Sequence, residues 1–203
     1  MFTRTESFSE YIRFYPIVSI FLFINISLFL ITLIPGFGYT VQFSGMGINS
    51  LIADGEWWRF VTPMFLHGGF MHILFNMFCL FVFGPELEKL TGKMRFTTLF
   101  MLSGIFANVA TYFFQDLGYA HLGASGAIFG IFGAYGALIY YTKRSMPQLR
   151  QIILPIIIIS VIMTFIGQNI NVTAHIAGLV VGFLIGLSYF NPKRILSWKT
   201  NKR

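Results

Sequence analysis

The tetrapeptide Gly123-Ala124-Ser125-Gly126 places a hydroxyl group between glycines, directly before the apolar run 127–141. Glycine lets a backbone turn sharply and approach a ligand closely. The first turn of a helix also presents backbone N–H groups that have no partner within the helix and can face an anion. A serine at this position therefore has two parts of an acyl-transfer site, which are a nucleophile and donors for a developing oxyanion.

The same tetrapeptide also fits a purely structural role. Small residues line contacts between membrane helices, because they let two backbones pack closely. A four-residue match by itself does not separate packing from catalysis. Other residues of the chain have to decide between the two interpretations.

The composition predicts a polytopic membrane protein. The 203 residues are 56% apolar and only 10% charged, whereas soluble domains carry about 25% charged residues. Six apolar segments predict an all-α bundle of six transmembrane helices in a single membrane domain, 1–203, with no separate soluble domain. An even number of spans places both termini on one side. The predicted spans are 17–34, 70–83, 96–114, 125–141, 152–167 and 172–190.

The basic residues predict the orientation of these spans. Of the 14 lysines and arginines, 13 lie in segments on the same side as the termini, and only Arg59 lies on the other side. Positively charged loops remain in the cytoplasm, so both termini are expected there. The net charge of +7 is then a feature of topology. We expect the protein to have the lipid bilayer, and no nucleic acid, as a partner.

Three polar side chains are predicted to lie at one depth. The second, fourth and sixth spans run in the same direction, and each ends at a lysine. Ser125, His175 and His72 lie 17 or 18 residues before these lysines, which corresponds to about 27 Å of helix. All three therefore fall near the outer edge of the membrane core, with Asn76 one turn deeper. Ionisable residues inside spans are costly and usually functional, so we expect these side chains to converge.

Small residues predict that the fourth and sixth spans pack closely. They recur along one face of each helix, at Ala174, Gly178, Gly182 and Gly186 in the sixth span and at Gly126, Gly130, Ala134 and Ala137 in the fourth. Two such faces allow helices to approach closely. The expected approach would bring Ser125 and His175 within hydrogen-bonding reach, about 2.6–3.2 Å.

Together these motifs resemble the rhomboid family of intramembrane serine proteases. The matching residues are His67, His72 and Asn76, spaced as H-x4-H-x3-N, then Gly123-Ala124-Ser125-Gly126, then Ala174-His175-x-x-Gly178, with further matches at Trp58-Arg59 and Glu88. The resemblance covers all six spans in order. It implies the minimal six-span bacterial type, a location in the cell membrane, and an active site that opens to the extracytoplasmic side.

The resemblance also implies a role for each residue. Ser125 would be the nucleophile and His175 the general base, in a dyad without an acidic third member. His72, Asn76 and the turn at Gly123 would stabilise the oxyanion. Supporting residues would be Phe129, expected to stack on the His175 ring, together with His67, Gly178, Arg59 and Glu88. No cofactor is implied, and no zinc-ligand spacing such as H-E-x-x-H occurs. The implied substrates are single-span membrane proteins.

Two other functions agree less well with the sequence than proteolysis does. A non-catalytic rhomboid relative that binds and escorts membrane helices would have lost Ser125 or His175, and both are present. A transporter or channel would carry polar residues across the whole membrane, whereas the inner halves of the second, fourth and sixth spans are almost entirely apolar. The sequence does not indicate an oligomeric state.

Overall fold

The computed structural model describes residues 5–143, 145–167 and 169–192. The chain is mostly helical. Its α-helices are α1 (Phe8–Phe14), α2 (Pro16–Thr32), α3 (Phe37–Gly45), α4 (Asn49–Ala53), α5 (Phe70–Thr91), α6 (Lys93–Phe114), α7 (Ser125–Thr142), α8 (Pro147–Ile166) and α9 (Val172–Phe190). Two 3-10 helices, η1 (Trp57–Phe60) and η2 (Thr62–Phe65), precede α5. The strands β1 (Gly47–Ile48) and β2 (Ala120–His121) form one short antiparallel pair.

The helices agree with a membrane protein. Within the described ranges, α5, α6, α8 and α9 are each long and apolar enough to cross a bilayer, and α1 with α2 makes a fifth span if this pair, bent by 112°, is counted as one. The helical, polytopic class predicted from composition is therefore confirmed. The sixth span would be α7, which is rich in glycine, and the count of six and the side of the termini stay predictions.

The helices α5 and α8 exceed the predicted spans by the most. The helix α8 begins at Pro147 rather than at 152, because proline is well suited to the first turn of a helix. The helix α5 continues beyond 83 to Thr91 and includes Pro85. Proline deprives the carbonyl four residues earlier of its helical donor. The Tyr11 hydroxyl donates to that carbonyl, on Phe81, at 3.1 Å, so the helix can continue.

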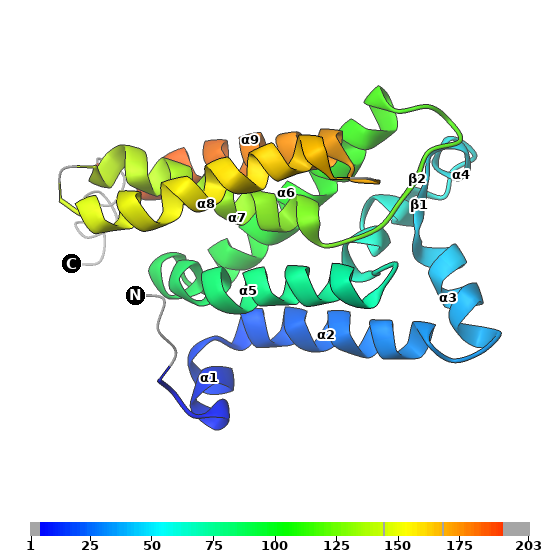
Figure 1. Ribbon diagram of the computed structural model, residues 1–203, viewed down its shortest axis with the longest axis horizontal. Coiled ribbons are helices and arrows are strands. Elements are labelled where there is room, and N and C mark those ends of the chain that lie inside the picture. The colour runs from blue at the N-terminus through cyan, green and yellow to red at the C-terminus, as the bar shows by residue number, and fades with distance from the viewer. Residues whose placement is uncertain (1–4, 144, 168, 193–203) are drawn as a thin grey trace.

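The helix α7 lies at the centre of the bundle. It contacts α5, α6, α8 and α9, and most of its side chains are buried. Figure 1 shows α8 and α9 alongside α7, with α2 beside α5 at the other side of the molecule. A methyl group on Gly178 would meet the Gly126 carbonyl oxygen, and one on Gly182 would meet that of Gly130. The predicted contact between these helices is therefore present, while the Cα of Gly126 also faces Ala107 of α6.

Arg59 organises the segment between α3 and η1. Its side chain is buried, and its guanidinium donates to the carbonyls of Phe43 and Met46 at 2.8 and 2.5 Å. It also pairs with the Glu56 carboxylate at 2.6 Å. A buried guanidinium needs such partners, because unpaired buried charge is costly. Arg59 thus connects three points of the first long loop.

Glu88 supports the start of α2. Its two carboxylate oxygens accept the backbone N–H groups of Ile17 and Val18 at 3.0 and 2.9 Å. These N–H groups belong to the first turn of α2, where no helical acceptor exists, and a negative charge there also suits the helix dipole. Glu88 therefore ties α5 to the beginning of α2.

Candidate active site

Ser125 is the first residue of α7, and a turn that requires glycine precedes it. Gly123 has φ +131°, a conformation that L side chains rarely adopt. Its N–H donates to the Pro63 carbonyl of η2 at 2.8 Å. A methyl group on Gly123 would also lie 2.7 Å from His72 Nε2. Glycine is therefore required here both by the backbone conformation and by the approach of His72 on α5.

The His175 ring packs against α7 close to Ser125. It is buried at the start of α9 and stacks on the Phe129 ring, with 4.1 Å between the centroids and 16° between the planes. Phe129 lies one turn after Ser125, on the same side of α7. The expected contact between Phe129 and His175 is thus present, and their roles in catalysis stay predictions.

The Nδ1 atom of the His175 ring has a hydrogen-bond partner that the sequence pattern does not reveal. Thr164 Oγ1, on α8, lies 2.9 Å from His175 Nδ1. Thr164 is 2% exposed. The only signal in the sequence is that Thr164 is, with Ser160, one of two hydroxyl side chains in the apolar segment 152–167. The expected dyad is therefore oriented by a hydrogen bond as well as by packing.

Ser125 and His175 are not directly hydrogen-bonded in this structure. Within the described part of the chain, the hydrogen bond of the His175 ring is the one to Thr164. Catalytic hydrogen bonds of free enzymes are often long and shorten when substrate binds. The helix contact at Gly126 and Gly178 brings α7 and α9 together within one turn of both residues.

Of the three residues expected to stabilise an oxyanion, His72 and Asn76 lie on α5, and Gly123 lies in the turn before α7. His72 faces Gly123, two residues before Ser125. Asn76 is mostly buried, and its Nδ2 donates to the His72 carbonyl at 2.8 Å. An amide NH2 group has two donors, so one N–H of Asn76 remains for another acceptor.

The His67 ring contacts the His72 ring. The edge of one ring faces the other, with 5.0 Å between the centroids and 71° between the planes. His67 is almost fully buried, and neither of its ring nitrogens has a hydrogen-bond partner among the described residues; the same holds for His121 in β2. Burial lowers the pKa of His67 from 6.5 to about 3, with a smaller effect of His72, and lowers the pKa of His121 from 6.5 to about 4.

These two histidines predict that the fold is destabilised by acid. Each is neutral when folded and has its ordinary pKa of 6.5 when unfolded. The stability that it contributes is therefore lost progressively as the pH falls from 6.5 towards about 3 for His67 and about 4 for His121. At pH 5 the expected loss is about 2 kcal/mol for each histidine. Thermal unfolding in detergent at pH 7.5 and pH 5 measures this. Replacing His67 and His121 by phenylalanine should make the difference smaller, and equal melting temperatures of the unaltered protein at both pH values would contradict it.

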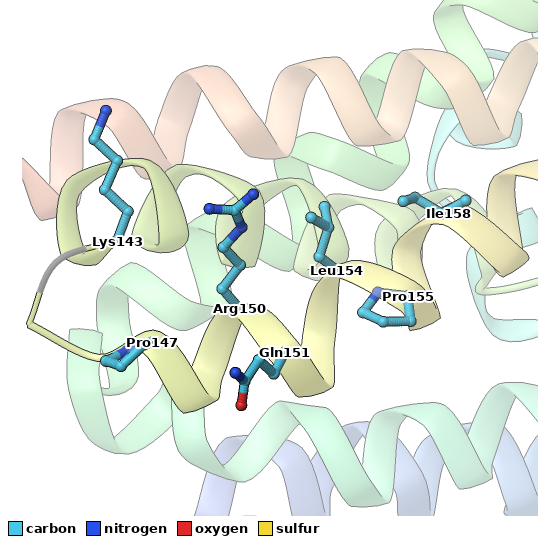
Figure 2. A pocket seen from close by; sticks show the side chains of 7 residues that line it. All are labelled: Lys143, Pro147, Arg150, Gln151, Leu154, Pro155 and Ile158. Atoms are coloured by element: carbon cyan, nitrogen blue, oxygen red, sulfur yellow. The ribbon is translucent and has the colours of Figure 1, made fainter.

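Two cavities lie away from these residues. One, of about 430 Å³, lies between the end of α7 and the first half of α8, lined by Lys143, Pro147, Arg150, Gln151, Leu154, Pro155 and Ile158 (Figure 2). This cavity lies at the C-terminal end of α7, whereas Ser125 lies at its N-terminal end. The other, of about 410 Å³, is lined mainly by α2, α3 and η2 and is apolar. Neither contains a candidate catalytic side chain, and no group of three or more His, Cys, Asp or Glu in the described ranges is placed to hold a metal ion.

Comparison with known proteins identifies the family. Residues 54–192 match the Rhomboid domain family, a range that includes each candidate site residue. The chain belongs to the rhomboid family. With its apolar helices, this rhomboid is a multi-pass membrane protein.

Several relatives of this rhomboid are named as proteases. It is 42% identical over 187 residues to a candidate rhomboid protease, YdcA of Bacillus subtilis, an alignment that covers 91% of this chain and 94% of the relative. It is 40% identical over 149 residues to the rhomboid protease GluP of the same organism, covering 71% of this chain and 28% of GluP. It is 31% identical over 145 residues to a rhomboid-type serine protease 2 of Emericella nidulans, covering 70% of this chain and 29% of that protein.

Proposed function

We propose that this rhomboid is an intramembrane serine endopeptidase in which Ser125 is the nucleophile and His175 the general base. The observation that carries the proposal is the position of the His175 ring, which stacks on Phe129 one helical turn from Ser125. The glycine contact between α7 and α9 supports this pairing, because it fixes both helices at close distance. A base held in this way beside a serine at a helix N-terminus has the arrangement that activated nucleophiles need.

The proposed reaction proceeds in two steps. His175 Nε2 accepts the Ser125 hydroxyl proton while Oγ bonds to the carbonyl carbon of the scissile peptide. The oxyanion of the tetrahedral intermediate receives hydrogen bonds from the Ser125 N–H, His72 and Asn76. The intermediate then expels the amine, which takes the proton from His175 and leaves an acyl-enzyme. Water, deprotonated by His175, attacks the acyl carbon, and Ser125 leaves with that proton.

The depth of the site explains how hydrolysis can occur in a membrane. Ser125, His72 and His175 belong to the same ends of their helices, and the excess of Lys and Arg at the opposite ends favours an opening to the extracytoplasmic side of a bacterial cell membrane. Water can then reach the site from outside. Substrates are single-span membrane proteins that enter laterally past α8. The side chains of α8 are mostly exposed, with only three of them buried in the bundle.

The test is cleavage by the purified protein in proteoliposomes that contain a single-span model substrate. We expect two fragments, and covalent labelling of the protein by a fluorophosphonate probe. Mass spectrometry of the labelled peptide locates the modified side chain. A protein that binds the substrate but neither cleaves it nor takes up the label would be an escort protein, and the proposal would be wrong.

The oxyanion donors predict a specific kinetic effect. His72→Ala and Asn76→Ala should each lower kcat by about 10- to 1,000-fold, because preorganised donors act on charge that develops in the transition state. KM should change much less, since the ground-state carbonyl carries little of that charge. Initial cleavage rates over a range of substrate density in the bilayer separate the two constants. A raised KM with unchanged kcat would instead show that His72 and Asn76 contact substrate.

A further inference from the structure

We propose that Thr164 is a positioning residue, which holds His175 in the tautomer that carries its proton on Nδ1 and leaves Nε2 free to act as the base. The inference rests on the proposed function of Ser125 and His175. It adds a third residue, on a third helix, to the expected dyad.

The hydrogen bonds of Thr164 define the direction of the proton. A threonine hydroxyl has one proton to donate and two lone pairs. Thr164 Oγ1 donates that proton to the Ser160 carbonyl at 3.0 Å, and a carbonyl oxygen can only accept. The contact of 2.9 Å to His175 must then use a lone pair of Oγ1, so Nδ1 is the donor. In a neutral imidazole the other nitrogen, Nε2, carries the free lone pair.

Burial makes this preference strong. Thr164 is 2% exposed and His175 9% exposed, and a hydrogen bond is electrostatically stronger in such surroundings than in water. With the opposite tautomer, the single hydroxyl proton of Thr164 could serve either the Ser160 carbonyl or Nδ1 but not both, so one of the two buried hydrogen bonds would be lost. A hydroxyl also orients the ring without adding a charge. A carboxylate in the same role would bring a costly negative charge into the membrane.

The position of Thr164 makes the tautomer depend on α8. The buried residues of α8 are Leu149, Ile153 and Thr164, and only Thr164 belongs to its second half. It therefore anchors the end of α8 that lies beside His175. Outward displacement of this half would break the hydrogen bond and release the ring from its tautomer.

Kinetic comparison of three variants tests the inference. Thr164→Val keeps the shape of the side chain but removes the hydroxyl, and should lower kcat by about 10- to 100-fold, which is less than the 100- to 10,000-fold that a general base contributes in full. KM should stay within a factor of about two, because substrate binding is not altered. Thr164→Ser restores a hydroxyl and should recover most of kcat. Ser160→Ala, one turn earlier on α8, removes a side-chain hydroxyl that does not contact His175 and should be as active as the unaltered protein.

Nitrogen NMR gives a readout that is independent of activity. With 15N-labelled histidine, the four histidines are assigned by single replacements. We expect His175 to carry its proton on Nδ1, and the Thr164→Val spectrum to show both tautomers. A proton on Nε2 in the unaltered protein, or full activity of Thr164→Val, overturns the inference. Ser125→Ala is measured in parallel: its activity would overturn the proposed function itself, whereas an inactive Ser125→Ala beside a fully active Thr164→Val would overturn only the role of Thr164.

Discussion

Replacing Ser125 by alanine is expected to reduce cleavage of a single-span substrate below the level that can be detected. The oxyanion donors and the substrate contacts would remain, but no nucleophile would be left to form the acyl-enzyme. Such donors by themselves accelerate hydrolysis about 1,000- to 10,000-fold over water. Spontaneous peptide hydrolysis is so slow that even this accelerated rate is not detectable. Cleavage in proteoliposomes and labelling by fluorophosphonate measure the effect, and both should disappear.

Ser103, a serine away from the candidate site, provides the control for this prediction. Ser103 on α6 is fully buried, and its hydroxyl has no hydrogen-bond partner within the described ranges. Ser103→Ala should therefore cleave substrate and take up the probe like the unaltered protein. The melting temperature of Ser125→Ala should also be unchanged, because the replacement removes a single oxygen atom from a partly exposed side chain. Cleavage by Ser125→Ala well above background would show that another residue is the nucleophile.

A single methyl group on Gly178 is also expected to lower the rate of cleavage, although glycine has no reactive side chain. The added carbon of Gly178→Ala would meet the backbone carbonyl of Gly126, which cannot rotate away as a side chain can. The helices α7 and α9 would have to separate, and His175 would move away from Ser125. Misplacement by about 1 Å can lower a rate about 100-fold. We therefore expect kcat to fall by about that factor.

Gly136 tests whether the contact, rather than the loss of a glycine, causes this effect. It lies on α7, and a methyl group there would meet only the Phe183 ring at 3.4 Å, an ordinary contact distance. Gly136→Ala should retain activity and also gain slightly in helix stability. Equal activities of Gly178→Ala and Gly136→Ala in the cleavage assay would mean that the close contact at Gly126 does not position the dyad.

The sequence by itself determined the class of the protein and the helices that meet. Apolar composition predicts membrane helices because a bilayer has no water to solvate charged side chains. The glycine positions on α7 and α9 predict close approach, because only residues without large side chains permit it. The common depth of Ser125, His175 and His72 is a prediction from helical rise alone. Each of these inferences depends on a regular, local property that can be counted along the chain.

The tertiary structure decided how side chains pair across helices. The sequence does not show that Thr164 reaches His175, because this depends on the rotation of α8 about its axis relative to α9, which no periodicity encodes. The same holds for Tyr11, whose hydroxyl meets the carbonyl that Pro85 leaves free, and for Gly126, whose Cα faces α6 while its carbonyl faces α9. A hydrogen bond requires two groups within about 3 Å and in line. Helical periodicity predicts which face of a helix is buried, but it does not predict which side chain on that face meets which neighbour. The partner of His175 therefore follows from the packed bundle alone.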